Sequence, residues 1–88
     1  EFLVVMFNSD HIQTEQTMQN LRTEIMNSTF RYMTKSLKIT VSIGIASCLF
    51  TGPFSTVDLE KLISEADAAM YESKTAGKNT ITSRLVYF

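Results

Sequence analysis

The distribution of hydrophobic and polar residues along the chain predicts five elements of regular structure. Residues 2–7 are an uninterrupted apolar run rich in β-formers, which is typical of a strand covered on both faces. The run stops at residues 8–10, Asn-Ser-Asp, which are turn and helix-capping types. Apolar residues then recur every three or four positions, so we expect an amphipathic helix from about Ile12 that ends between Asn27 and Tyr32.

Residues 38–50 show a different pattern, in which large and small side chains alternate. The odd positions carry large apolar side chains such as Ile43 and Ile45, and the even positions carry small ones such as Gly44 and Ala46. A period of two predicts a strand. We expect its bulky face to point toward the core and its small face to lie against an element that approaches closely. Residues 51–54, which include a glycine and a proline, are expected to end it.

A second helix is predicted after this turn. Ser55 or Thr56 can cap its N-terminus, and acidic residues occupy its first turn, where the helix dipole favours negative charge. Gly77 stands where a C′ glycine ends a helix. A last strand is expected over residues 80–88, which gives the order β-α-β-α-β and an α/β fold with helices on the sheet.

Composition narrows the class of protein. A chain of 88 residues with 44% hydrophobic and 19% charged residues is one small globular domain at most, and not a disordered chain. Eight basic and nine acidic side chains give a formal charge of −1, so we expect no nucleic acid partner and no membrane contact by this segment. The single Cys48 cannot form an internal disulfide, which fits a reducing, cytoplasmic location.

Three segments, in this order, resemble the GGDEF domain, the catalytic domain of diguanylate cyclases. Glu1 and Phe2, with the apolar run after them, resemble the last two letters of the family signature and the strand that follows it. Residues 39–47 (ITVSIGIAS) match the family's TVSIGIA strand, and residues 65–79 (EADAAMYESKTAGKN) match its ADxALYxAKxxGRN helix end. The resemblance implies that residues 1–88 are the C-terminal portion of a single GGDEF domain.

This resemblance implies a ferredoxin-like sheet with flanking helices, akin to the palm of nucleotide polymerases and cyclases. In that fold another strand lies between the signature strand and the TVSIGIA strand. The parent domain is expected to bind GTP with Mg²⁺ or Mn²⁺ as cofactor, and to act as a homodimer in which each domain presents one GTP. Two GTP molecules then form cyclic di-GMP and two pyrophosphates, with positioning and charge neutralisation supplying most of the acceleration. Membrane attachment of the parent protein stays open.

The resemblance assigns roles to three residues by position. Glu1 corresponds to the fourth signature residue, which contributes a carboxylate to the catalytic metal, so it is the candidate catalytic and metal-binding residue. Lys74 and Lys78 correspond to the Lys-x-x-x-Arg pair that contacts the GTP phosphates. The residues alone also admit plainer roles, namely a solvated glutamate and two cations that complement the negative end of a helix. Lysine at position 78 keeps the charge of the usual arginine but lacks its planar guanidinium group, which can donate two parallel hydrogen bonds. Weaker binding of phosphate is therefore expected.

Other polar residues of these segments are expected to be structural. Asp67 lies one helical turn from Tyr71 and two turns from Lys74 and can pair locally, His11 is expected to be solvated, and Cys48 is expected to be a small buried side chain.

Three functions remain open on the sequence. The first is a diguanylate cyclase, in which the 88 residues alone are expected to be inactive because the family's other metal carboxylate and its guanine-binding residues precede Glu1. The second is a degenerate GGDEF domain that acts as a GTP-binding or protein-interaction regulatory module, which Lys78 favours slightly. The third is an α/β interaction domain that shares the motifs by chance.

Overall fold

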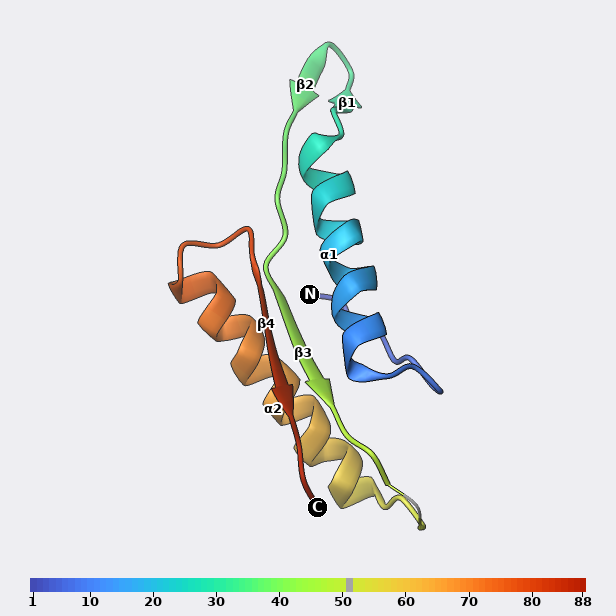
Figure 1. The fold of residues 1–88 in the computed structure, drawn as a ribbon. Coiled ribbons are helices and arrows are strands. Elements are labelled where there is room, and N and C mark those ends of the chain that lie inside the picture. Colours follow the sequence, from blue (N-terminus) through green and yellow to red (C-terminus); the bar gives the residue numbers. More distant parts are fainter. Residues whose placement is uncertain (51) are drawn as a thin grey trace.

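The computed structural model describes residues 1–50 and 52–88, in which two helices and four strands form (Figure 1). The helices are α1 (His11–Asn27) and α2 (Thr56–Thr75). The strands are β1 (Phe30–Tyr32), β2 (Lys35–Leu37), β3 (Ile43–Ser47) and β4 (Ile81–Leu85). The chain is therefore of the mixed α/β class that the sequence predicts.

Both helices begin where their capping residues predict. The Asp10 carboxylate accepts a hydrogen bond from the backbone N–H of Gln13 at 2.7 Å, and the Gln13 side chain accepts one from the backbone N–H of Asp10. Ser55 and Asp58 form the same reciprocal pair at the start of α2, both at 3.1 Å. Each capping box gives partners to backbone donors that the first helical turn leaves unpaired.

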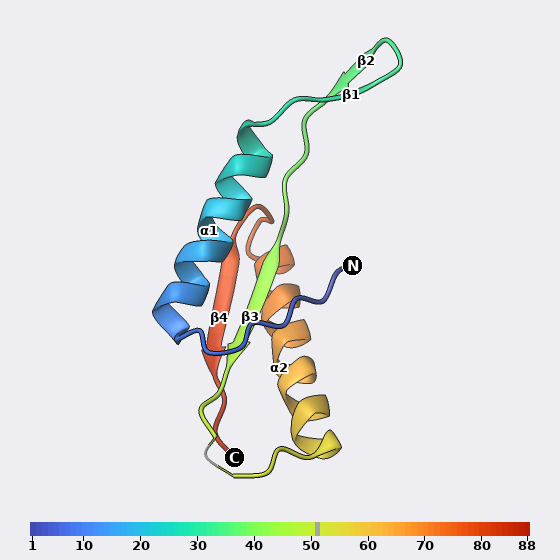
Figure 2. The ribbon, with the colours of Figure 1, turned by 90° about the vertical axis from the view of Figure 1, so that its right-hand side faces the viewer.

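The helices lie on opposite faces of a two-stranded parallel sheet (Figures 1 and 2). Strand β3 pairs with β4 in a register that joins Ile43 to Ile81 and Ser47 to Leu85. Helix α1 packs on one face of this sheet and α2 on the other. Within the described residues, β3 has a partner on one edge only.

The small face of β3 lies directly against α2, as the alternation of side chains predicts. A Cβ built on Gly44 would collide with the backbone N of Met70 and the backbone O of Ala66. Next to this contact the hydroxyl of Ser73, which is fully buried, donates to the carbonyl of Ile43 at 2.8 Å and lies 2.7 Å from the hydroxyl of Thr82. This close approach joins α2 to both strands.

The prediction of a strand at residues 2–7 is wrong for this structure. The segment has no regular secondary structure, and Phe2 is 99% exposed. A strand needs a neighbour to pair its backbone N–H and C=O groups, and no strand of the described residues pairs with this one. The β-forming composition of the segment is not sufficient without a partner.

The two other predicted strands are shorter than expected. Residues 38–50 form a strand only at Ile43–Ser47, and residues 80–88 only at Ile81–Leu85, because these are the stretches where the two segments pair with each other. The expected turn at 51–54 is described from Gly52 onward, and Thr51 lies outside the described residues.

The sequence analysis did not predict the hairpin of β1 and β2. These antiparallel strands, with Phe30 opposite Leu37, extend beyond the end of α1 (Figures 1 and 2). Every residue of both strands is exposed. A strand of three exposed residues is too short to give a recognisable alternation of apolar and polar side chains in the sequence. The hairpin could therefore not be predicted from the sequence pattern.

The core is small and the molecule is elongated. The buried hydrophobic side chains of the described residues are those of Ile45, Ala69 and Val86. The radius of gyration is 15.0 Å, whereas a compact chain of this length has about 12 Å. Neither helix of the described part of the chain has the length and apolar character to span a membrane.

Candidate functional site

The unpaired edge of β3 opens onto a groove of about 1050 Å³ between the two helices. Apolar side chains of α1, α2 and residues 39–48 line most of it, and residues 1–6 run along it. Figure 2 shows this N-terminal segment passing across β3. Glu1, Asp67 and Lys74 are the charged residues in the lining, so one groove contains acidic and basic groups from the N-terminal segment and from α2.

Glu1 is exposed and lies in the irregular N-terminal segment. Its carboxylate offers the oxygen donor that a hard cation such as Mg²⁺ or Mn²⁺ prefers. Within residues 1–50 and 52–88, however, no group of three or more His, Cys, Asp or Glu side chains comes together. The chemistry of Glu1 therefore fits one ligand of a metal site, and the remaining ligands of such a site would come from elsewhere.

Lys74 lies in the last turn of α2, where its side chain is exposed and reaches the groove that Glu1 also lines. No ion pair of the described residues involves Lys74 or Lys78. Both ammonium groups are thus free of carboxylate partners in this part of the chain. The negative end of the α2 dipole lies beside Lys74 and favours a cation there.

Lys78 lies in the turn that follows α2 and does not belong to the lining of the groove. Helix α2 ends with Ala76 at its C-cap, and Gly77 takes a left-handed conformation at φ 111°, which confirms its predicted C′ role. The backbone N–H of Lys78 donates to the carbonyl of Ser73 at 3.0 Å, the bond that defines a Schellman motif. The structure thus brings Glu1 and Lys74 to one groove and leaves Lys78 outside its lining.

Asp67 makes no local pair, contrary to the prediction. Its side chain is exposed and lines the groove, and no hydrogen bond or ion pair of the described residues joins it to Tyr71 or Lys74. The carboxylate therefore remains available to solvent or to a ligand in the groove.

His11 is not simply solvated, which corrects a second expectation. Its Nδ1 lies 2.9 Å from the hydroxyl of Ser47, and its Nε2 lies 2.6 Å from the carboxylate of Glu15, which also accepts a hydrogen bond from Ser83. This chain of contacts joins the start of α1 to the end of β3 and to the middle of β4. Residues 36 positions apart meet in it, and the sequence carries no local signal for such a contact.

Cys48 also lines the groove and is half-buried. Burial, and secondarily the negative charge of Asp58, raise the pKa of the Cys48 thiol above its ordinary value. The thiol is therefore kept protonated and is a poor nucleophile at neutral pH.

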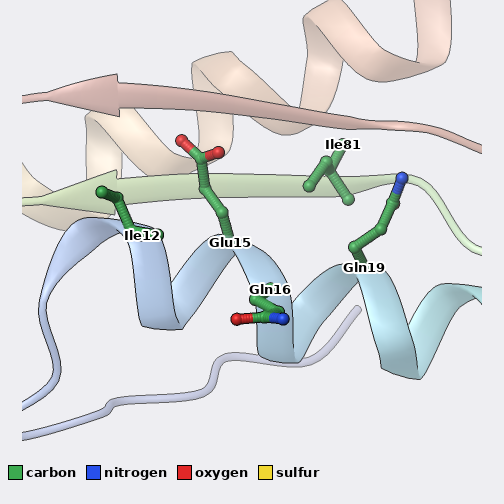
Figure 3. Close-up of a pocket in the computed structure, with 5 residues that line it drawn as sticks. All are labelled: Ile12, Glu15, Gln16, Gln19 and Ile81. Atoms are coloured by element: carbon green, nitrogen blue, oxygen red, sulfur yellow. The ribbon is translucent and has the colours of Figure 1, made fainter.

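A second, shallow depression lies between α1 and β4 and is lined by Ile12, Glu15, Gln16, Gln19 and Ile81 (Figure 3). Glu15 and Gln19 point toward the sheet in this view, and Gln16 points away from it. Its only charged group is a carboxylate, which is already bonded to His11 and Ser83. It therefore offers no cation that could bind a triphosphate.

Comparison with known proteins identifies the family. The sequence matches the family model described as "Diguanylate cyclase, GGDEF domain" over residues 1–80. It is 31% identical to Diguanylate cyclase A of Treponema denticola over 85 residues, which are 93% of this chain and 21% of that protein. It is 32% identical over 87 residues to the protein named Probable diguanylate cyclase DgcF in Escherichia coli K12, covering 99% of this chain and 27% of that protein.

The chain is also 32% identical over 87 residues to the protein named Probable diguanylate cyclase DgcF in Escherichia coli O157:H7, covering 99% of this chain and 18% of that protein. The chain thus spans about a fifth to a quarter of the length of these curated relatives. No solved structure gives a significant match. Because the family match extends over 80 of the 88 residues and includes Glu1, Lys74 and Lys78, the chain belongs to the GGDEF domain family of diguanylate cyclases.

Proposed function

We propose that the protein carrying this chain is a diguanylate cyclase, which condenses two GTP molecules into cyclic di-GMP and releases two pyrophosphates. The names of the curated relatives support this activity. The observation in this chain that carries the proposal is the exposed Lys74, which has no carboxylate partner in the described residues and lines the same groove as Glu1.

In this proposal Lys74 and Lys78 hold the triphosphate of GTP. Lys74 lies in the last turn of α2 and Lys78 in the turn that follows the helix, and both are exposed. A triphosphate carries several negative charges, and a charge-assisted hydrogen bond from an ammonium group is about twice as strong as a neutral one. The two lysines would therefore bind and orient the substrate without themselves taking part in bond making.

Glu1 would supply one carboxylate to Mg²⁺ or Mn²⁺. When bound, such an ion neutralises charge on the triphosphate and so favours displacement at the α-phosphorus. Since the described residues hold no complete set of metal ligands, we expect the 88 residues alone to be inactive. Activity would belong to the parent domain.

The proposed reaction requires two domains. The 3′-hydroxyl of each GTP attacks the α-phosphorus of the other, so that one P–O bond forms, the bond to the β-phosphate breaks, the proton leaves the hydroxyl, and pyrophosphate departs. In-line attack needs the two nucleotides to face each other. A homodimer that presents one GTP from each domain satisfies this requirement.

Two observations support a second candidate, a degenerate GGDEF domain that binds GTP or a protein partner without turnover. Position 78 carries lysine, which contacts phosphate as a point charge and lacks the two parallel N–H groups of arginine. In addition, Lys78 lies outside the lining of the groove that Lys74 and Glu1 share.

The deciding experiment uses the full-length protein. It is incubated with GTP and Mg²⁺, and the products are analysed by mass spectrometry, with a sample lacking the metal as control. Formation of cyclic di-GMP that depends on the metal supports the cyclase. Binding of GTP without any cyclic di-GMP or pyrophosphate supports the regulatory module and contradicts the cyclase.

A further inference from the structure

The turn between α2 and β4 has an unusual backbone. Gly77, Lys78 and Asn79 lie in the left-handed region one after another, with φ of 111°, 64° and 48°. Glycine adopts this region freely and asparagine tolerates it, but lysine seldom does. Such a conformation persists only where surrounding contacts hold it.

Two sets of contacts hold this turn. From its own helix, the carbonyl of Ser73 accepts the backbone N–H of Lys78 at 3.0 Å. From the other side of the sheet, Nη1 of Arg22 in α1 donates to the side-chain oxygen of Asn79 at 2.9 Å and to its backbone carbonyl at 3.3 Å. The amide nitrogen of Asn79 in turn lies 3.2 Å from the sulfur of Met26, also in α1. Helix α1 thus contacts Asn79, the residue next to Lys78, through two side chains.

The guanidinium of Arg22 is itself well fixed. Its Nε donates to the side chain of Gln19 at 2.8 Å, and the residue is half-buried. Within the described residues no carboxylate pairs with it. The hydrogen-bonding capacity of Nη1 is therefore directed at the turn and not at an acidic partner.

We propose that Arg22 is a positioning residue for nucleotide binding. It fixes the Gly77–Asn79 turn, so that the ammonium group of Lys78 is presented to the triphosphate together with that of Lys74. This inference rests on the proposed function, because it assigns to Arg22 a part in binding GTP. Without Arg22, the left-handed turn would lose both hydrogen bonds from the guanidinium, and Lys78 would sample several orientations.

The geometry distinguishes between substitutions at this position. A single nitrogen makes both bonds to Asn79, so the ammonium group of Arg22→Lys can replace it. Arg22→Met keeps a long aliphatic side chain and a similar helix propensity but removes every donor. Arg31→Ala removes an arginine from the exposed strand β1, which among the described helices and strands contacts β2 alone, and serves as the matched control.

The test measures KM and kcat for GTP in the full-length protein and these three variants, with melting temperature recorded for each. We expect Arg22→Met to raise KM by roughly tenfold with kcat changed by less than about twofold, because loss of uniform binding acts on KM. Arg22→Lys should return KM to within about twofold of the unsubstituted protein, and Arg31→Ala should not change it.

A further variant, at Asn79, separates loss of the contact with Arg22 from general misfolding. Asn79→Gly keeps the left-handed backbone and the backbone acceptor but removes the side-chain oxygen, and it should raise KM by about threefold. Unchanged KM in Arg22→Met, or equal losses in Arg22→Met and Arg22→Lys that follow melting temperature, would overturn the inference alone. If the unsubstituted protein makes no cyclic di-GMP, the proposed cyclase fails and the inference fails with it.

Discussion

The proposed function would give Lys74 a second role besides that of a cation at the end of α2. As a cation in the last turn of α2 it stabilises the helix through the dipole, by about 0.3–1 kcal/mol. It is also an exposed group on the wall of the groove, without a carboxylate partner in the described residues, and in the proposed function it binds phosphate. The two roles differ in what their loss would do to catalysis.

We predict that Lys74→Ala in the full-length protein lowers kcat/KM for GTP by at least about tenfold, because a hydrogen bond between charged groups contributes about 1.5–3 kcal/mol. Steady-state kinetics of pyrophosphate release measure this effect. Lys35→Ala, which removes an exposed lysine from β2, is the control and should leave the kinetics unchanged. Unaltered kinetics in Lys74→Ala would mean that the contact with the helix dipole is the whole role of this residue.

The environment of Cys48 leads to a prediction about pH. Because folding raises the pKa of this thiol, the folded protein holds the proton to higher pH than the unfolded chain does. The corresponding contribution to stability is present below the unfolded pKa and is lost as the pH rises through the folded pKa.

We therefore expect iodoacetamide to alkylate Cys48 several-fold more slowly in the folded protein than in urea at pH 8, since the thiolate is the reactive form. Mass spectrometry of the peptide containing Cys48 measures the rate without interference from other cysteines. Equal rates in the folded and unfolded protein would contradict the raised pKa.

At the scale of elements, the contact between β3 and α2 determines how Lys74 is placed. Gly44 lets the strand touch the helix backbone at Ala66 and Met70, which lie two turns and one turn before Lys74. Ser73, the neighbour of Lys74, is bonded to β3 and β4. These contacts fix the distance between the end of α2 and the sheet. Gly44, the glycine in the TVSIGIA segment, therefore has a packing role.

Gly44→Ala should destabilise the protein by about 3 kcal/mol, near the upper end of overpacking costs, because the atoms that its Cβ would meet are helix backbone and cannot rotate away. Urea unfolding of the full-length protein measures the change. Gly52→Ala is a matched control, since a Cβ at that position would meet nothing within 4 Å, and we expect it to change stability by less than about 0.5 kcal/mol. Similar stabilities for the two variants would contradict the tight contact.

Local sequence signals succeeded for the helices and partly failed for the strands. The capping residues Asp10 and Ser55 and the terminal Gly77 act within one turn of their own position, so the bounds of α1 and α2 could be predicted. Residues 2–7 have a strand composition but no partner in the described residues, and pairing is a property of two segments. The contact of Arg22 with Asn79 joins residues 57 positions apart and has no local signal.

At the scale of the whole molecule, the groove and the unpaired edge of β3 form one exposed surface. The groove runs along the unpaired edge of β3, and its lining is mostly apolar. The exposed side chains of residues 2–7 lie beside it. An unpaired edge with apolar neighbours is a surface that favours pairing with a further strand.

The proposed need for two GTP-bearing domains leads to a prediction about concentration. If the active unit of the full-length protein is a dimer, its specific activity should roughly double with each doubling of protein concentration while monomers predominate, and then level off. Initial rates of pyrophosphate release over a dilution series, with sedimentation at the same concentrations, measure this dependence. A specific activity that stays constant where sedimentation shows only monomers would contradict the dimer.

The sequence by itself determined the two helices, the α/β class and the family, because capping, periodicity and contiguous motifs are all encoded within short stretches of chain. It also identified Glu1, Lys74 and Lys78 as the residues to examine. Only the tertiary structure decided that Glu1 and Lys74 line one groove, that α1 holds the turn bearing Lys78, and that residues 2–7 remain unpaired. These features depend on which distant segments meet, and that outcome is set by packing and pairing across the whole fold.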